Sequence, residues 1–160
     1  MADQFIKFIG VEGESQQTGL KGWIELASFS MSSATSGSTN LGTGSGVGKP
    51  SIHGVNFSTV AGKHTPVIAQ KYFKGEHFTT VEVKFIKQTG KDSAETYYHL
   101  TMTNVFVTSM QAGKGEGSLG SESMSLTAEI YKQEYWTQDE KGALKSAGST
   151  TYNEKTNTSS

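Results

Sequence analysis

The stretch that decides the fold reads Trp23-Ile-Glu-Leu-Ala-Ser-Phe-Ser-Met-Ser32. Side chains of an extended chain alternate between its two sides, so Phe29 and Met31 fall on one side and small hydroxyls on the other. These hydroxyls belong to Ser28, Ser30 and Ser32. The pattern predicts a β-strand that packs one face on a core and leaves a smooth, neutral face in water.

A glycine- and serine-rich stretch follows this strand, from Ser33 to Lys49. It is too long and too rich in glycine to bury itself in the small domain around it. Loops of this kind often carry contacts with other molecules. We therefore expect an extended loop over residues 33–49 that serves assembly rather than catalysis.

Alternating apolar and polar residues predict further strands. These strands cover residues 4–9, 53–60, 81–85, 96–110 and 124–130. One helix is expected, with Thr65 as its N-cap, Pro66 at its first helical position and Gly75 at its end. Several strands with one helix predict a mainly β fold, a compact antiparallel β-barrel of two packed sheets with one short flanking α-helix.

The chain of 160 residues is expected to form a single barrel domain over residues 1–138, which includes the loop 33–49. Residues 139–160 are polar and weakly patterned, so we expect a C-terminal tail there. Within this tail, Thr151 and Tyr152 are expected to form at most a short edge strand.

Composition excludes several function classes. The chain has no cysteine, which excludes disulfides and thiol chemistry and is typical of a reducing compartment. Its 14 basic residues, all lysine, face 15 acidic ones, and the lack of arginine argues against a nucleic-acid reader. The N-terminus lacks the pattern of a secretory signal and no stretch reaches membrane-spanning length. We expect synthesis in the cytoplasm and export without a signal peptide.

Motifs for chemistry are weak. The run from Gly42 to Lys49 is superficially like a phosphate-binding loop, but Thr43 stands where the motif needs glycine. Pro50 follows where the motif needs serine or threonine, so a flexible loop is the favoured interpretation. The four histidines have no metal-ligand spacing: His53, His64, His77 and His99. No nucleophile elbow occurs, and we expect no enzyme activity, no cofactor and no metal.

An alternative function remains open at this point. Trp136 or Tyr135 near the end of the last long strand could stack on a sugar ring, which would make the chain a monomeric carbohydrate- or ligand-binding β-domain. Aromatic side chains in a β-domain more often pack in the core or across strands. Trp136 is expected to be the most exposed of six aromatic residues, the others being Trp23, Phe29, Tyr97, Tyr98 and Tyr135.

Four segments carry a family resemblance. They are Phe5-Ile-Lys-Phe-Ile-Gly-Val-Glu-Gly-Glu-Ser15, Trp23-Ile-Glu-Leu-Ala-Ser-Phe-Ser30, Gly46-Val-Gly-Lys49 and Gln138-Asp-Glu-Lys-Gly142. In their order and spacing, from about residue 4 to residue 142, they resemble the haemolysin-coregulated protein (Hcp) family of type VI secretion systems. Members of that family are similar to phage tail-tube proteins. The short segment after Lys145 matches the family's final strand only at Tyr152 and Asn153.

The resemblance implies a structural role. It implies a homohexameric ring, stacked rings that form a tube inside a contractile sheath, a spike protein of the VgrG type at the tip, and secreted effectors in the lumen. It places Ser28, Ser30 and Ser32 on the strand that faces the channel. It assigns contact between subunits or rings to the extended loop. The loop residues concerned are Ser38, Asn40, Leu41, Gly44, Val47 and Lys49.

Overall fold

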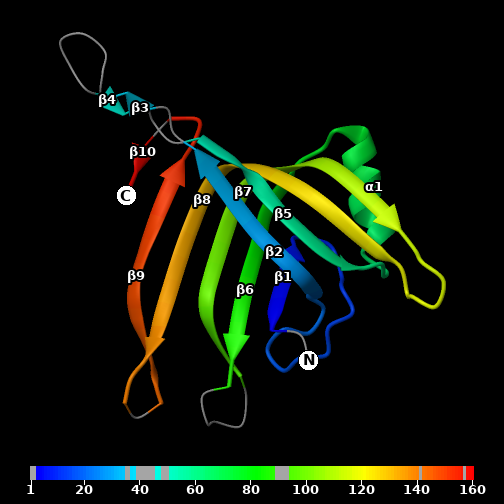
Figure 1. Ribbon diagram of the computed structural model, residues 1–160, viewed down its shortest axis with the longest axis horizontal. Helices are drawn as coiled ribbons and strands as arrows, with labels where there is room; N and C mark the ends of the chain where they lie inside the picture. The colour runs from blue at the N-terminus through cyan, green and yellow to red at the C-terminus, as the bar shows by residue number, and fades with distance from the viewer. Residues whose placement is uncertain are drawn as a thin grey trace.

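The computed structural model describes residues 3–34, 37–38, 46–47, 51–88, 94–140, 142–156 and 158–160. Ten strands and one helix lie within these residues (Figure 1). In chain order they are β1 (Gln4–Phe8), β2 (Ile24–Ala34), β3 (Gly37–Ser38), β4 (Gly46–Val47), β5 (Ser51–Val60), α1 (Thr65–Lys74), β6 (Phe78–Lys87), β7 (Glu95–Gly113), β8 (Ser121–Gln138), β9 (Leu144–Asn153) and β10 (Thr158–Ser159).

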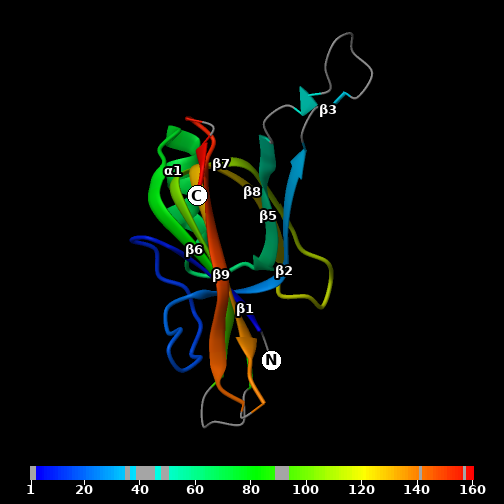
Figure 2. The same ribbon diagram turned by 90° about the vertical axis from the view of Figure 1, so that its left-hand side faces the viewer.

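Six of the strands close into an antiparallel barrel. Their order around it is β8, β5, β2, β1, β6 and β7, and β7 pairs with β8 again. Helix α1 lies on the side of the barrel opposite to β2 and β5 (Figure 2). Closure leaves few open strand edges within the barrel, the main one lying along β2, which pairs with β1 only at Ile24 and Glu25. The prediction of a mainly β, antiparallel barrel with one flanking helix is confirmed.

The barrel interior is filled by aromatic and aliphatic side chains. Phe8 lies at its centre, with ring centroids 4.9 Å from Phe78 and 6.1 Å from Phe57. Val55 and Leu126 pair across β5 and β8, and both are fully buried. Burial of each such side chain contributes about 1.5–3 kcal/mol of transfer free energy. The apolar side chains that alternate along the strands therefore gather on the inner side of the barrel.

Strand β9 corrects the expectation of a polar tail. Residues 144–153 form a ten-residue strand, although the sequence indicates at most a short edge strand there. The reason lies in β8, which is 18 residues long. Its first half pairs with β5 up to Leu126, and its second half pairs with β9 from Ile130 onward. Residues 144–153 have little apolar patterning of their own, and they form a strand because they pair with the free edge of β8.

The start of α1 also differs from the prediction. His64, rather than Thr65, is the N-cap, and its side chain makes no capping hydrogen bond. The hydroxyl of Thr65 is engaged elsewhere, because it accepts a hydrogen bond from the Gly62 amide at 3.1 Å and donates to Glu122. Gly75 ends the helix as predicted, in the left-handed conformation with φ of 69°.

The extended loop contains a short two-stranded ladder. Gly37 pairs with Val47, and Ser38 pairs with Gly46, in β3 and β4. Both strands stand away from the barrel, beyond the end of β2 (Figures 1 and 2). The remaining predicted contact residues lie outside the described residues, as do most of the residues compared with a phosphate-binding loop. Those contact residues are Asn40, Leu41, Gly44 and Lys49.

Candidate functional site

Two rows of small polar side chains cross four neighbouring strands, β2, β5, β8 and β7. The first row joins Ser28, Ser58, Ser123 and Gln111, each paired with the next across the sheet. The second row joins Ser30, Asn56, Ser125 and Ser109 in the same way. Because residues two apart on a strand share a face, both rows lie on the same surface of the sheet. We call this surface the hydroxyl face.

Burial separates the hydroxyl face from the core behind it. Phe57 and Met124, which alternate with its members on β5 and β8, are each only 2% exposed. Ser28, Ser30 and Ser32 are exposed, whereas Phe29 and Met31 pack against the core. The predicted division of this strand into a packed face and a wet face is therefore confirmed.

Two β-bulges place residues on this face. Strict alternation from the buried Leu26 would turn Ser28 toward the core, but the register shifts between Leu26 and Ser28. On β7, a second shift between Val107 and Ser109 turns Ser109 away from the core in the same way. A bulge inserts one residue and so reverses the side on which the following residues lie.

Hydrogen bonds within the face satisfy several of its polar groups. The hydroxyls of Ser28 and Ser58 are 2.5 Å apart, and the Ser125 hydroxyl donates to the side-chain Oδ1 of Asn56 at 2.5 Å. The Thr108 hydroxyl donates to the Ser125 carbonyl oxygen at 3.2 Å. Groups that already bond to one another bind a passing molecule weakly, since each new bond replaces an existing one.

The hydroxyl face forms a shallow depression of about 270 Å³. Its lining residues are the eight members of the two rows with Phe57 and Met124 beneath them, and none of them is ionisable. Such a surface holds no ion pair, no activated nucleophile and no general base. It offers a neutral wall along which a polar surface can move.

Sequence reasoning found only the β2 part of this face. It missed Asn56, Ser58, Ser109, Gln111, Ser123 and Ser125. Alternation on β5 and β8 does predict an outward side for Ser58 and Ser125. What the sequence does not give is the register, which decides that these residues stand beside Ser28 and Ser30.

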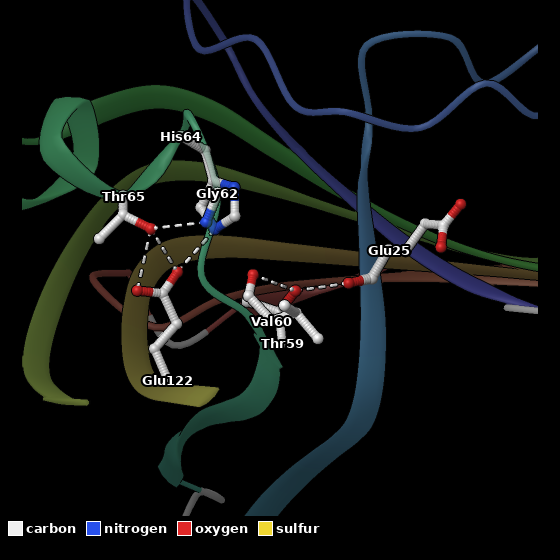
Figure 3. A network of polar contacts seen from close by, with 7 residues as sticks. All are labelled: Glu25, Thr59, Val60, Gly62, His64, Thr65 and Glu122. Carbon is white, nitrogen blue, oxygen red and sulfur yellow. Dashed lines mark hydrogen bonds and ion pairs between the residues drawn. The ribbon is translucent and has the colours of Figure 1, made fainter. Parts of the chain in front are cut away.

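A separate buried polar network links α1 to β8 (Figure 3). The Nε2 atom of His64 lies 2.6 Å from a carboxylate oxygen of Glu122, and the two side chains are 4% and 2% exposed. The Thr65 hydroxyl lies 3.1 Å from both carboxylate oxygens. The network fastens the first turn of the helix to the start of β8, which is a structural role.

The three histidines whose side chains the structure describes, His64, His77 and His99, lie apart from one another. His99 pairs with Glu82 at 2.9 Å on the barrel surface, and the His77 ring packs on Phe106 with centroids 5.5 Å apart. Within the described residues, no three His, Asp or Glu side chains are arranged to hold a metal ion. The polar contacts of His64 and His99 are those of structural pairs with glutamate.

The aromatic pair of the alternative function lies on the second half of β8. Tyr135 is 45% exposed, whereas Trp136 is half-buried, so the expectation that Trp136 is the most exposed aromatic residue is wrong. Phe73 on α1 is 83% exposed. Tyr135 and Tyr98 line a shallow depression of about 330 Å³ beside β9. Burial raises the pKa of the Tyr98 phenol.

Comparison with known proteins gives consistent results. A family model described as "Type VI secretion system effector, Hcp" matches residues 5–135. A solved structure of "a type six secretion system protein" is 26% identical, with a TM-score of 0.89 over 100% of both chains. Hcp1 from Salmonella typhimurium is 23% identical, with a TM-score of 0.80 over 100% of both chains.

A type VI secretion system effector from Yersinia pestis shares the fold at 21% identity, with a TM-score of 0.71 over 94% of this chain and 99% of that chain. No curated protein matches the sequence. The single helix of the described residues, ten residues long, falls short of what crossing a bilayer requires.

Proposed function

Because the chain belongs to the Hcp family of secreted structural proteins in type VI secretion systems, we propose that it is the tube subunit of such a system. In this proposal, copies form hexameric rings, and the rings stack into an inner tube. A contractile sheath expels the tube behind a spike of the VgrG type. The subunit is made in the cytoplasm and leaves without a signal peptide.

The observation that carries the proposal is the hydroxyl face. It spans four neighbouring strands of one copy, is solvent-facing and has no ionisable side chain in its depression. In a ring, the same face from every copy would line the channel, with Ser28, Ser30 and Ser32 among its wall residues. An uncharged wall that binds weakly allows cargo of either charge to be carried and then released. Helix α1 then lies on the outer side of the tube, away from β2 and β5 (Figure 2).

Open strand edges support self-association. Strand β2 pairs with β1 only through Ile24 and Glu25, so the rest of that edge of β2 has no partner strand within the described residues. The outer edge of β9 is covered only from Thr151 to Asn153, by β10 and Ser160. Exposed strand edges are templates for pairing with another chain. A copy with two such edges is suited to contact neighbours on both sides.

The extended loop is assigned to contact between rings or subunits. Its ladder of β3 and β4 stands beyond the barrel at one end of the molecule, where a neighbour along the tube axis would lie (Figure 1). The barrel domain of residues 1–138, together with β9, forms the wall. The proposed contact residues are Ser38, Asn40, Leu41, Gly44, Val47 and Lys49.

Electron microscopy and native mass measurement of the purified protein test this function. Six-membered rings, and stacks of rings at higher concentration, are the expected result. Monomers at every concentration, together with contact-dependent secretion that survives loss of the gene, would overturn the proposal. Glycan binding by a monomer, abolished by Tyr135→Ala, would favour the carbohydrate-binding alternative instead.

A further inference from the structure

Helix α1 exposes large apolar side chains to solvent, in addition to the apolar side that packs on the barrel. Of its ten residues only Ile68 is buried. Val67 is 39% exposed and Phe73 is 83% exposed, and Gln70 and Lys74 lie exposed on the same side at helical spacing. The Phe73 ring contacts the neighbouring Tyr72 ring, with centroids 5.5 Å apart, and aromatic side chains that become buried on binding are common interface anchors. We call Phe73 and Lys74 the α1 knob.

The α1 knob carries positive charge. The helix contains no acidic residue, and both lysines of its last turn complement the helix dipole. Lys71 is committed to the barrel, because its ammonium lies 4.9 Å from the centroid of the Phe78 ring. Lys74 is exposed and makes no ion pair with any other described residue. Glu76, beyond the helix end, is the nearest acidic residue in sequence.

At the other end of α1 lies a pocket of opposite charge, which we call the acidic pocket. It measures about 170 Å³ and is lined by Glu14, Ser15, Ile24, Glu25, Thr59, Val60, Ala61 and His64. Its two glutamates are exposed, and neither is paired with a cation of the described chain. Val60, which is 48% exposed, supplies an apolar wall.

Hydrogen bonds hold two of the residues that line the acidic pocket. The His64 ring is hydrogen-bonded to Glu122, and the Thr59 hydroxyl donates to the Glu25 carbonyl oxygen at 2.5 Å (Figure 3). An apolar cavity of about 150 Å³ is large enough to bind benzene, so a pocket of this size admits one phenyl ring. An aromatic side chain followed by an ammonium group is therefore the chemistry that the pocket fits.

The α1 knob and the acidic pocket of one copy cannot meet. His64 caps the helix and lines the pocket, and Phe73 lies nine residues farther along. At 1.5 Å per residue the two are separated by about 14 Å along a rigid helix. We propose that the α1 knob of one copy of this chain docks in the acidic pocket of a second copy, with Phe73 beside Val60 and Lys74 toward Glu14.

A contact of this kind is heterologous, since the two surfaces differ. Heterologous contacts repeat from copy to copy and generate rings or continuing stacks rather than closed pairs. The inference therefore rests on the proposed self-assembly and deepens it by naming residues on both sides. It assigns the C-terminal end of α1, at Phe73 and Lys74, to contact between neighbouring subunits on the outer side of the tube.

Sedimentation velocity over a concentration series, at low salt, tests the contact with the full chain. Phe73→Ala is expected to weaken association about tenfold or more, as truncation of an anchor does. Leu119→Ala is the matched control, because Leu119 is 84% exposed but lies in the turn between β7 and β8. It is expected to associate like the unaltered protein. Circular dichroism checks that each variant keeps its fold.

A charge exchange identifies the partner surface. Lys74→Glu is expected to weaken association, and adding Glu14→Lys in the same chain is expected to restore it. Rings that form equally well with Phe73→Ala and Lys74→Glu would overturn the inference and leave the tube function standing. Loss that Glu14→Lys does not restore would also overturn it. Failure of the unaltered chain to assemble would instead count against the proposed function.

Discussion

Removing the Glu122 carboxylate should destabilise the barrel far more than removing a similar carboxylate on its surface. Glu122 is 2% exposed and is the partner of both His64 and Thr65. Glu122→Ala leaves a buried imidazole and a half-buried hydroxyl without their acceptor. Breaking one side of a buried pair of this kind costs about 3–5 kcal/mol. For a domain whose total stability is about 5–15 kcal/mol, that is a large fraction.

A second pair of glutamate and histidine in the same chain, which is more exposed, is the control. Glu82 pairs with His99 at 2.9 Å, close to the 2.6 Å of the buried pair, but the side chains are 34% and 18% exposed. Solvent screens such a pair, so Glu82→Ala is expected to cost about 1 kcal/mol or less. Glu122→Gln, which keeps a carbonyl acceptor and the side-chain volume, should fall between the two alanine variants.

Urea unfolding, monitored by near-ultraviolet circular dichroism, measures the three free energies. The concentration of protein should be low enough that unfolding does not depend on it, because assembly would add apparent stability. Equal losses for Glu122→Ala and Glu82→Ala would refute the reasoning, since burial is the main difference between the pairs. A loss for Glu122→Gln as large as for Glu122→Ala would show that the charge, rather than the acceptor, matters.

Three further predictions address the wall, the core and the loop. Gly54→Ala should lower the unfolding free energy by about 1–3 kcal/mol in urea titration, because a Cβ atom there would lie 2.9 Å from the Leu126 carbonyl oxygen at φ of +132°. Above about pH 10, the ordinary pKa of tyrosine, stability should fall as pH rises, since burial raises the pKa of Tyr98 and the folded state keeps the proton. Tyr98→Phe should reduce this alkaline loss in urea titrations. Replacing residues 37–48 by a short turn should leave the circular dichroism spectrum of the barrel intact but weaken ring stacking in sedimentation, and loss of the fold would contradict it.

The sequence predicts those parts of the fold that follow from local alternation. Within the run from Ser28 to Ser32, alternation with a period of two places Phe29 and Met31 on the core side and the serines on the other side. Strand β9 could not be found in this way. Its run from Leu144 to Asn153 contains few apolar residues, and it becomes a strand because the second half of β8 offers it an edge. Pairing is a tertiary effect that overrides weak local preference.

The candidate site likewise has a part that local alternation predicts and a part that depends on strand pairing. Alternation predicts that Ser30 points outward, but the row that it starts depends on the register of three further strands. On β7, strict alternation predicts the wrong side of the sheet for Ser109. Counting by twos from the buried Val105 places Ser109 toward the core, and only the bulge after Val107 turns it outward. No composition signal in that stretch marks the bulge, so the extent of the hydroxyl face required the structure.

Strand β8 explains how a neutral wall and a buried charge coexist in a small barrel. Glu122 points inward to His64, and its neighbour Ser123 points outward to the hydroxyl face. Since adjacent side chains of a strand lie on opposite faces, the carboxylate that fastens α1 adds no charge to the wall. The two requirements of the proposed tube, a firm outer helix and an uncharged channel, are thus met by consecutive residues. A slip of one residue in the register of β8 would exchange them, placing a carboxylate in the channel and a serine beneath the helix.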